Sequence, residues 1–216
     1  MRVAEHDRDV VPWSVFFASL VAFFVAWLAG VEWLRLVLKP VPVLALAAWV
    51  SLVRTPLART VLVGLLLGAV GDVLLETGNT AHFLPGLVAF LLGHVAYVVG
   101  FAREAPGWHW ARLAPFVLLV VTVLLVTVPG LGAFAAPVVL YGCVIGLLLW
   151  RAAARVGVTQ PAWLAWLGLC GAALFAASDA LIAVNRFVAP FTGAKAVILV
   201  TYWAAQALLT LSVRRP

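Results

Sequence analysis

The sequence predicts an all-α, polytopic membrane protein. Three observations lead to this fold class: 66% of the 216 residues are hydrophobic, only 10% are charged, and the mean hydropathy is +1.16. A soluble domain carries about 25% charged residues. The apolar runs are long and continuous, whereas the strands of a membrane barrel would alternate in polarity. We therefore expect a single transmembrane domain over residues 1–216, in a multi-pass protein of the cell membrane.

Eight membrane helices are predicted, because about 20 residues cross the hydrocarbon core of a bilayer. The expected spans are 12–30, 33–53, 57–76, 82–102, 112–129, 131–150, 161–184 and 193–213. The first is the apolar run that follows the charged N-terminal residues, and it is too long for the core of a signal peptide.

Turn-forming residues set the ends of the later spans. Arg54-Thr55-Pro56 ends the second span, and Thr77-Gly78-Asn79-Thr80 separates the third from the fourth. Pro129-Gly130 divides the fifth from the sixth, and the stretch 157–161 opens the seventh. A Pro-Gly pair favours a tight turn, so the fifth and sixth spans are expected to form a hairpin.

Basic residues predict the orientation, since Lys and Arg concentrate on the cytoplasmic side of a membrane. One side collects most of them: Arg2, Arg8, Arg54, Arg59, Arg103, Arg112, Arg151, Arg155, Arg214 and Arg215. The other side carries Arg35, Lys39, Arg186 and Lys195. Both termini are therefore expected in the cytoplasm, in agreement with an even number of spans. This distribution of basic residues accounts for the net charge of +6 and favours contact with anionic lipids. No nucleic-acid partner is therefore needed to explain the charge.

Asp72 and Asp179 are unusual because each lies inside an apolar run. A carboxylate at membrane depth costs roughly 2.5–3.5 kcal/mol on insertion scales unless it is paired, hydrated or protonated. At 1.5 Å per residue, the two lie about 20 and 24 Å from the cytoplasmic face. Their similar settings are compatible with a parallel repeat of spans 1–4 and 5–8. The pair predicts acid/base catalysis, with a structural role as the alternative.

Other polar residues fall on helix faces that could converge on one cavity with the aspartates. They are candidates for substrate binding: Lys39, Glu76, His94, Tyr97, Lys195, Tyr202 and Gln206. Each also has a simpler interpretation. The lysines can extend to the headgroups, Glu76 can be an interfacial charge, the histidine can belong to the core, and the tyrosines can be ordinary interhelical hydrogen-bond donors.

Motifs around these residues resemble the YhhN/TMEM86 family. They are Lys39-Pro40, Gly71-Asp72-Val73-Leu74-Leu75, the pattern of Phe83, Gly86, Phe90, His94 and Tyr97, the segment 171–183 with Ser178-Asp179, and Thr201-Tyr202-Trp203-Ala204-Ala205-Gln206. The similarity extends from about Lys39 to Ser212. Trp203 departs from the family pattern, in which a second tyrosine is expected.

The resemblance implies lysoplasmalogenase activity. Such an integral membrane hydrolase cleaves the vinyl ether bond of a lysoplasmalogen, giving a fatty aldehyde and glycerophosphocholine or glycerophosphoethanolamine. It further implies catalytic roles for Asp72 and Asp179, a lysophospholipid substrate, and no cofactor or metal. The reaction passes through an oxocarbenium ion, as glycoside hydrolysis does, and two carboxyl groups can divide the acid and base roles.

A proton-coupled lipid or small-molecule transporter is the alternative function. Buried Asp, His and Tyr residues also form proton relays, and a parallel repeat suits alternating access. No discontinuous helix flanks either aspartate in the sequence pattern, which favours the enzyme.

Overall fold

The computed structural model describes residues 2–213, and their side chains from Val10 onward. Over these residues the chain is helical and contains no strand, which confirms the all-α class. The elements are α1 (Arg2–Leu28), α2 (Glu32–Leu38), α3 (Val41–Ser51), α4 (Pro56–Glu76), α5 (Thr80–Glu104), η1 (Trp110–Arg112), α6 (Ala114–Leu131), η2 (Gly132–Phe134), α7 (Ala135–Arg155), α8 (Ala162–Phe187) and α9 (Ala194–Leu211).

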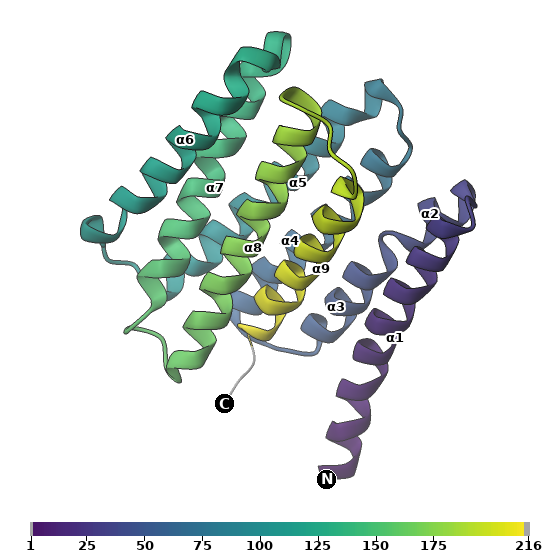
Figure 1. The fold of residues 1–216 in the computed structure, drawn as a ribbon. Helices are drawn as coiled ribbons and strands as arrows, with labels where there is room; N and C mark the ends of the chain where they lie inside the picture. The colour runs from purple at the N-terminus through teal and green to yellow at the C-terminus, as the bar shows by residue number, and fades with distance from the viewer. Residues whose placement is uncertain (1, 214–216) are drawn as a thin grey trace. The chain divides into compact units, whose positions relative to one another are not determined.

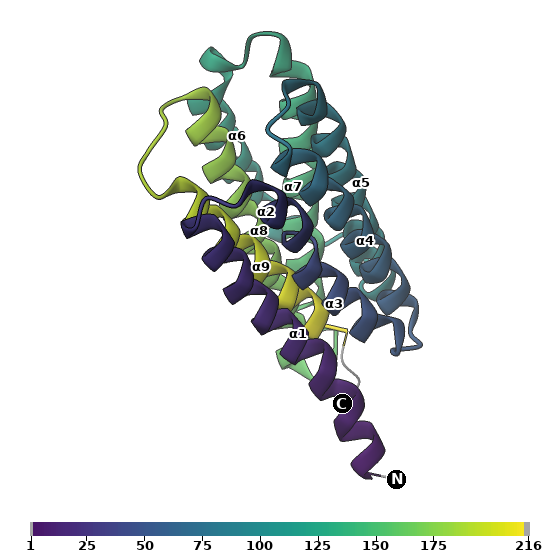
Figure 2. The same cartoon turned by 90° about the vertical axis from the view of Figure 1, so that its right-hand side faces the viewer.

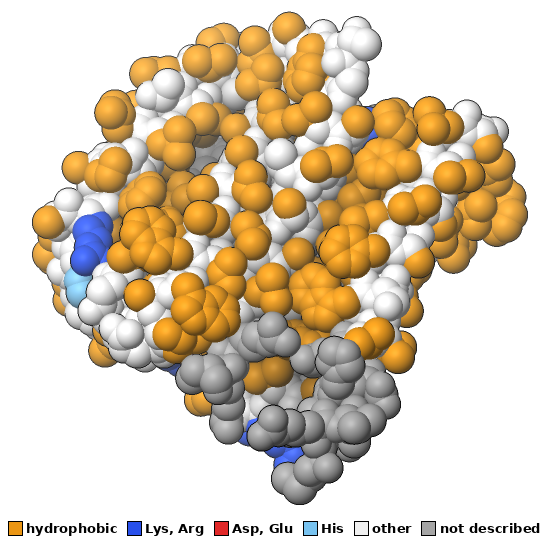
Figure 3. Space-filling view, turned by 60° about the horizontal axis from the view of Figure 1, so that its bottom comes forward, with side chains coloured by type: hydrophobic (Ala, Val, Ile, Leu, Met, Phe, Trp, Pro, Cys, Tyr) orange, Lys and Arg blue, Asp and Glu red, His pale blue; other side chains and the backbone are white. Residues whose placement is uncertain are grey.

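Among the described residues, 7 helical stretches are long and apolar enough to cross a membrane. This is the pattern of a multi-pass membrane protein. One of the stretches, Trp110–Arg155, has 46 residues and contains both α6 and α7. The face in Figure 3 is covered largely by hydrophobic side chains, as expected for a surface in contact with lipid. Eight spans, a parallel repeat and cytoplasmic termini remain predictions.

The chain divides into two compact units, Met1–Ala96 and Tyr97–Pro216, with the boundary inside α5. In the first unit α3 packs against both α1 and α4, and α2 also contacts α1 and α4 (Figure 2). In the second unit α7 and α9 each pack against α8, while α6 contacts α7 and α8 (Figure 1). A single domain over the whole chain remains a prediction.

Two boundaries differ from the sequence-based expectation. The span 33–53 is built from two helices, α2 and α3, because Pro40 has no N–H to donate within a continuous helix. The expected turn at Pro129-Gly130 is wrong, since both residues lie inside α6. The chain turns at Gly132, whose φ of 51° is a conformation that glycine adopts without steric cost. A Cβ on Gly130 would instead collide with the carbonyl oxygen of Phe187, so this glycine permits close packing against the end of α8.

Glycines also bring α4 and α5 together within the first unit (Figure 2). A Cβ on Gly71 would lie 2.5 Å from the Phe90 ring, and one on Gly93 would lie 3.1 Å from the carbonyl oxygen of Gly64. Small residues allow membrane helices to approach closely. This close approach helps to bury Asp72, the residue that follows Gly71.

Arginines hold helix ends together in the second unit. Arg155 Nε donates to Glu104 Oε2 at 2.8 Å, and its guanidinium lies over the Phe101 ring, 4.4 Å from the centroid. Arg151 donates to the backbone carbonyls of Ala105 and Gly107. The Arg151 bonds satisfy backbone carbonyls of the segment that follows α5. Arg155 was expected among the charges that face the membrane surface, but its side chain is fully buried.

Candidate functional site

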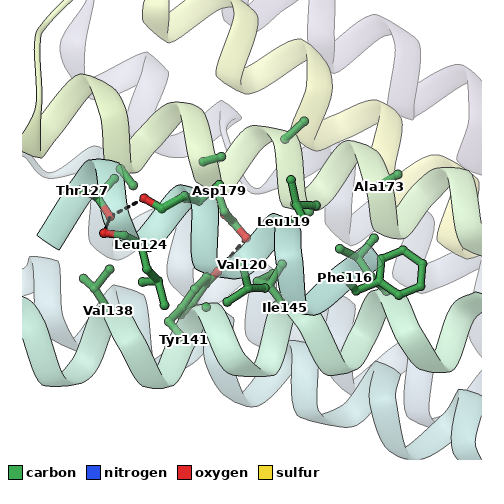
Figure 4. A pocket seen from close by; sticks show the side chains of 17 residues that line it. Phe116, Leu119, Val120, Leu124, Thr127, Val138, Tyr141, Ile145, Ala173 and Asp179 are labelled. Atoms are coloured by element: carbon green, nitrogen blue, oxygen red, sulfur yellow. Dashed lines mark hydrogen bonds between the residues drawn. The ribbon is translucent and has the colours of Figure 1, made fainter. Parts of the chain in front are cut away.

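A cavity of about 280 Å³ lies among α6, α7 and α8 of the second unit (Figure 4). Its wall is almost entirely apolar. Space is left there because α7 contributes Gly142 and α8 turns alanines toward its neighbours. The α8 lining residues besides Asp179 are Ala173, Ala176, Ala177, Ala180 and Ala183. An apolar cavity with few polar groups is the usual form of a small-molecule site.

Asp179 is the one carboxylate among the described residues that line this cavity. The Tyr141 hydroxyl on α7 donates a hydrogen bond to Asp179 Oδ2 at 3.1 Å (Figure 4). Thr127 also lines the cavity, but its hydroxyl donates to the Val123 carbonyl of its own helix at 2.9 Å. Tyr141 therefore fixes the orientation of the carboxyl group in an apolar environment.

Asp72 and His94 are both buried in the first unit, each with 1% of its surface exposed. Asp72 lies on α4 beside Gly71, and the Phe90 ring packs against that glycine from α5. His94 follows Phe90 by one helical turn on the same face of α5. Both side chains are therefore covered by protein, while their convergence on one cavity and the pairing of Asp72 with Asp179 remain predictions.

Glu76 joins α4 to α2 through two ion pairs. Lys39 Nζ lies 3.2 Å from Glu76 Oε2, and Arg35 Nε lies 3.3 Å from Glu76 Oε1. Only 4% of the Glu76 side chain is exposed, so it is not a simple interfacial charge. Arg35 was not among the sequence candidates. Its position four residues before Lys39 was the available signal, because this spacing puts both cations on one helix face.

Tyr97, Gln206 and Tyr202 form a hydrogen-bonded chain in the second unit. The Tyr97 hydroxyl donates to Gln206 Oε1 at 2.7 Å, and Gln206 Nε2 donates to the Tyr202 hydroxyl at 3.3 Å. Tyr202 also packs edge-on against Phe175 of α8, with 5.4 Å between ring centroids. The structure thus brings three sequence candidates together. Lys195 lies in the first turn of α9, before Tyr202 and Gln206 in the sequence, and its side chain is partly buried.

Tyr141 is the residue that the sequence interpretation missed. The chain has only 3 tyrosines, and the other two, Tyr97 and Tyr202, were recognised from their motifs. Tyr141 has no polar neighbour at helical spacing and falls in the part of the chain without a family motif. A single tyrosine in an otherwise apolar membrane helix was the remaining signal, because its hydroxyl needs a hydrogen-bond partner when buried.

Comparisons with known proteins place the chain in a family. The YhhN family model matches residues 34–213. The chain is 32% identical to "Lysoplasmalogenase TMEM86A" of Bos taurus over 91% of its own length and 86% of that protein. It is 34% identical to "Lysoplasmalogenase TMEM86B" of Homo sapiens, covering 96% of this chain and 88% of the relative. No solved structure matches significantly. The predicted resemblance is confirmed: this chain belongs to the YhhN family.

Proposed function

We propose that this protein is a membrane hydrolase that cleaves the vinyl ether bond of lysoplasmalogen or a similar lysolipid. The products are a fatty aldehyde and glycerophosphocholine or glycerophosphoethanolamine. The observation that carries the proposal is the Asp179 carboxyl, held by Tyr141 on the wall of an apolar cavity. A hydrocarbon chain and an acid/base group can meet there. The lysoplasmalogenase names of the relatives support the same reaction.

Asp72 and Asp179 divide the acid and base roles in this proposal. One carboxylic acid donates its proton to the β-carbon of the vinyl ether, and the double-bond electrons form the new C–H bond. The resulting oxocarbenium ion is stabilised by the other, ionised carboxylate, which also takes a proton from the attacking water. The hemiacetal hydroxyl then gives its proton to the first carboxylate as the C=O of the aldehyde forms. The bond to the glycerol oxygen breaks, and that oxygen takes the proton held by the second carboxyl, so both groups return to their starting states. One water is consumed for each substrate cleaved.

The remaining candidates bind the polar part of the substrate. Lys39 and Lys195 are proposed to contact the phosphate, and Arg35 adds a second cation on α2, with Glu76 keeping Arg35 and Lys39 in place. His94, Tyr97, Tyr202 and Gln206 are proposed to orient water or a carboxyl group. The enzyme would act in the cell membrane, where its lipid substrate resides.

The proposed function is tested with the purified protein in detergent micelles. It should release aldehyde and the glycerophospho-alcohol from a 1-alkenyl lysophospholipid, measured by mass spectrometry. The matched 1-O-alkyl lipid lacks the double bond and should remain intact, because no oxocarbenium ion can form by protonation. Failure to cleave the alkenyl lipid would refute the hydrolase, and lipid movement across proteoliposomes without cleavage would favour the transporter.

Tyr141→Phe is expected to lower kcat by roughly tenfold or more, since a hydrogen bond to a charged group contributes about 1.5–3 kcal/mol. KM should change little, because the hydroxyl holds Asp179 and not the lipid. Thr127→Val is the matched control: it removes a hydroxyl from the same cavity, but one that is bonded within its own helix. Steady-state kinetics of both variants checks this, and equal effects would exclude a positioning role for Tyr141.

A further inference from the structure

The cavity that contains Asp179 (Figure 4) is open on one side. Among the described residues that line it, only Leu119 on α6 and Ala173 and Ala177 on α8 are exposed. The lining residues of α7 are all buried or half-buried. Helix α7 therefore forms the base of the cavity, and the opening lies between α6 and α8. We name this opening the mouth, with Leu119, Ala173 and Ala177 as its rim.

The other two helix pairs around the cavity are held close together. Between α6 and α7, a Cβ on Gly146 would lie only 2.9 Å from a methyl group of Val120. Between α7 and α8, the Tyr141 hydroxyl bonds to the Asp179 carboxyl at 3.1 Å. A lipid can therefore reach Asp179 more easily between α6 and α8 than across either of these contacts.

The position of the mouth along α8 (Ala162–Phe187) places it at membrane depth. Ala173 and Ala177 lie within about 4 Å of the middle of this helix, at 1.5 Å per residue. Helix α8 and the stretch that contains α6 are both long and apolar enough to cross a membrane. The mouth is therefore expected to face hydrocarbon and not water.

The surface beside the mouth is apolar as well. On α6, 68% of Leu118 and 73% of Leu125 is exposed. On α8, Trp166 and Cys170 are exposed on the same helix face as Ala173, one and two turns before it. None of these side chains carries a charge that would attract a headgroup from water, whereas all of them suit contact with lipid chains.

We infer that the lipid substrate enters sideways from the bilayer through the mouth, and that most of its alkenyl chain stays in the bilayer during the reaction. This inference rests on the proposed function, which supplies the substrate class. With the vinyl ether at Asp179, the chain leaves past Ala177 and Ala173, about 3 and 9 Å farther along α8. A route through water would instead expose every CH2 group of the chain at a cost in free energy.

Narrowing the mouth tests this route, with the protein in phospholipid nanodiscs and 1-hexadecenyl lysophosphatidylcholine as substrate. Leu119→Trp and Ala177→Trp should each lower kcat/KM by about tenfold, because a bulky ring overfills the opening. Leu118→Trp is the matched control, since it makes the same change at the next residue of α6, which is exposed but does not line the cavity. It should keep the wild-type kcat/KM, whereas unchanged kcat/KM in both rim variants would overturn the inference.

A photoreactive lipid locates the chain without any reaction. The probe is a 1-O-hexadecyl lysophosphatidylcholine with a diazirine in the middle of its chain, and mass spectrometry maps its cross-links. Excess unlabelled 1-O-hexadecyl lysophosphatidylcholine should suppress cross-links at the rim, because one bound lipid occupies the mouth. Cross-links at Leu118 come from the surrounding lipid and should be suppressed much less. Equal suppression at Leu118 and at the rim would also overturn the inference.

These two measurements separate the route from the reaction itself. If the wild-type protein shows suppressible cross-links at the rim but does not cleave the alkenyl lipid, the route stands and the proposed hydrolysis fails. If it cleaves the alkenyl lipid but the rim variants keep full kcat/KM, the hydrolase stands and the route is wrong. Thermal unfolding of each variant confirms that folded proteins are being compared.

Discussion

Replacing either aspartate by asparagine is expected to lower aldehyde release from lysoplasmalogen by roughly 10³-fold, within the range that a general acid or base contributes. Asn keeps the shape of the side chain and can still accept a hydrogen bond from Tyr141. It can neither donate a proton to carbon nor take one from water. Asp179→Asn and Asp72→Asn should therefore unfold near the wild-type temperature and bind the 1-O-alkyl lipid while losing turnover.

A matched control for this pair is Glu32→Gln, which removes a carboxylate of the same chain from an exposed position, where 85% of the side chain is accessible. Its activity should equal that of the wild type. Asp179→Glu should recover part of the lost rate, since a carboxyl group returns at a slightly different position. Full activity in Asp72→Asn or in Asp179→Asn would eliminate a two-carboxylate mechanism.

Arg155→Met is expected to destabilise the protein by about 3 kcal/mol, as for the breaking of a buried ion pair. The variant removes the 2.8 Å bond to Glu104, the bond from Nη2 to the Ser212 carbonyl and the contact with the Phe101 ring. Glu104, with 33% of its side chain exposed, stays partly hydrated, which places the cost near the lower end of the range for buried pairs. Thermal unfolding in detergent measures the effect as a lower Tm.

Arg103→Met provides the comparison, because Arg103 is exposed on the same helix as Glu104. The same substitution there should change the free energy of unfolding by no more than about 0.5 kcal/mol, as for other surface replacements. Its Tm should therefore stay close to that of the wild type. Equal loss of stability in the two variants would mean that Arg155 contributes only as a charge near the membrane. A larger loss at Arg155 supports its role in holding the ends of α5, α7 and α9.

Composition and pattern alone predicted the all-α class, the multi-pass character and the family. The reason is physical: a chain this apolar must satisfy its backbone hydrogen bonds within its own segments, and helices do so. The same reasoning made the rare polar residues conspicuous. Among the residues it singled out, Lys39 pairs with Glu76, and Tyr97 and Tyr202 each bond to Gln206, while their roles in substrate binding remain predictions.

Tertiary structure alone decided which helix faces meet and where space remains between them. In a membrane helix every face is apolar, so periodicity does not reveal which residues face a neighbour and which face lipid. The pattern around Tyr141 therefore did not indicate its hydrogen bond to Asp179. The pattern around Arg155 likewise did not indicate that its side chain is buried. The cavity beside Asp179 is lined by alanines of α8, and its presence could be recognised only once α6, α7 and α8 are packed together.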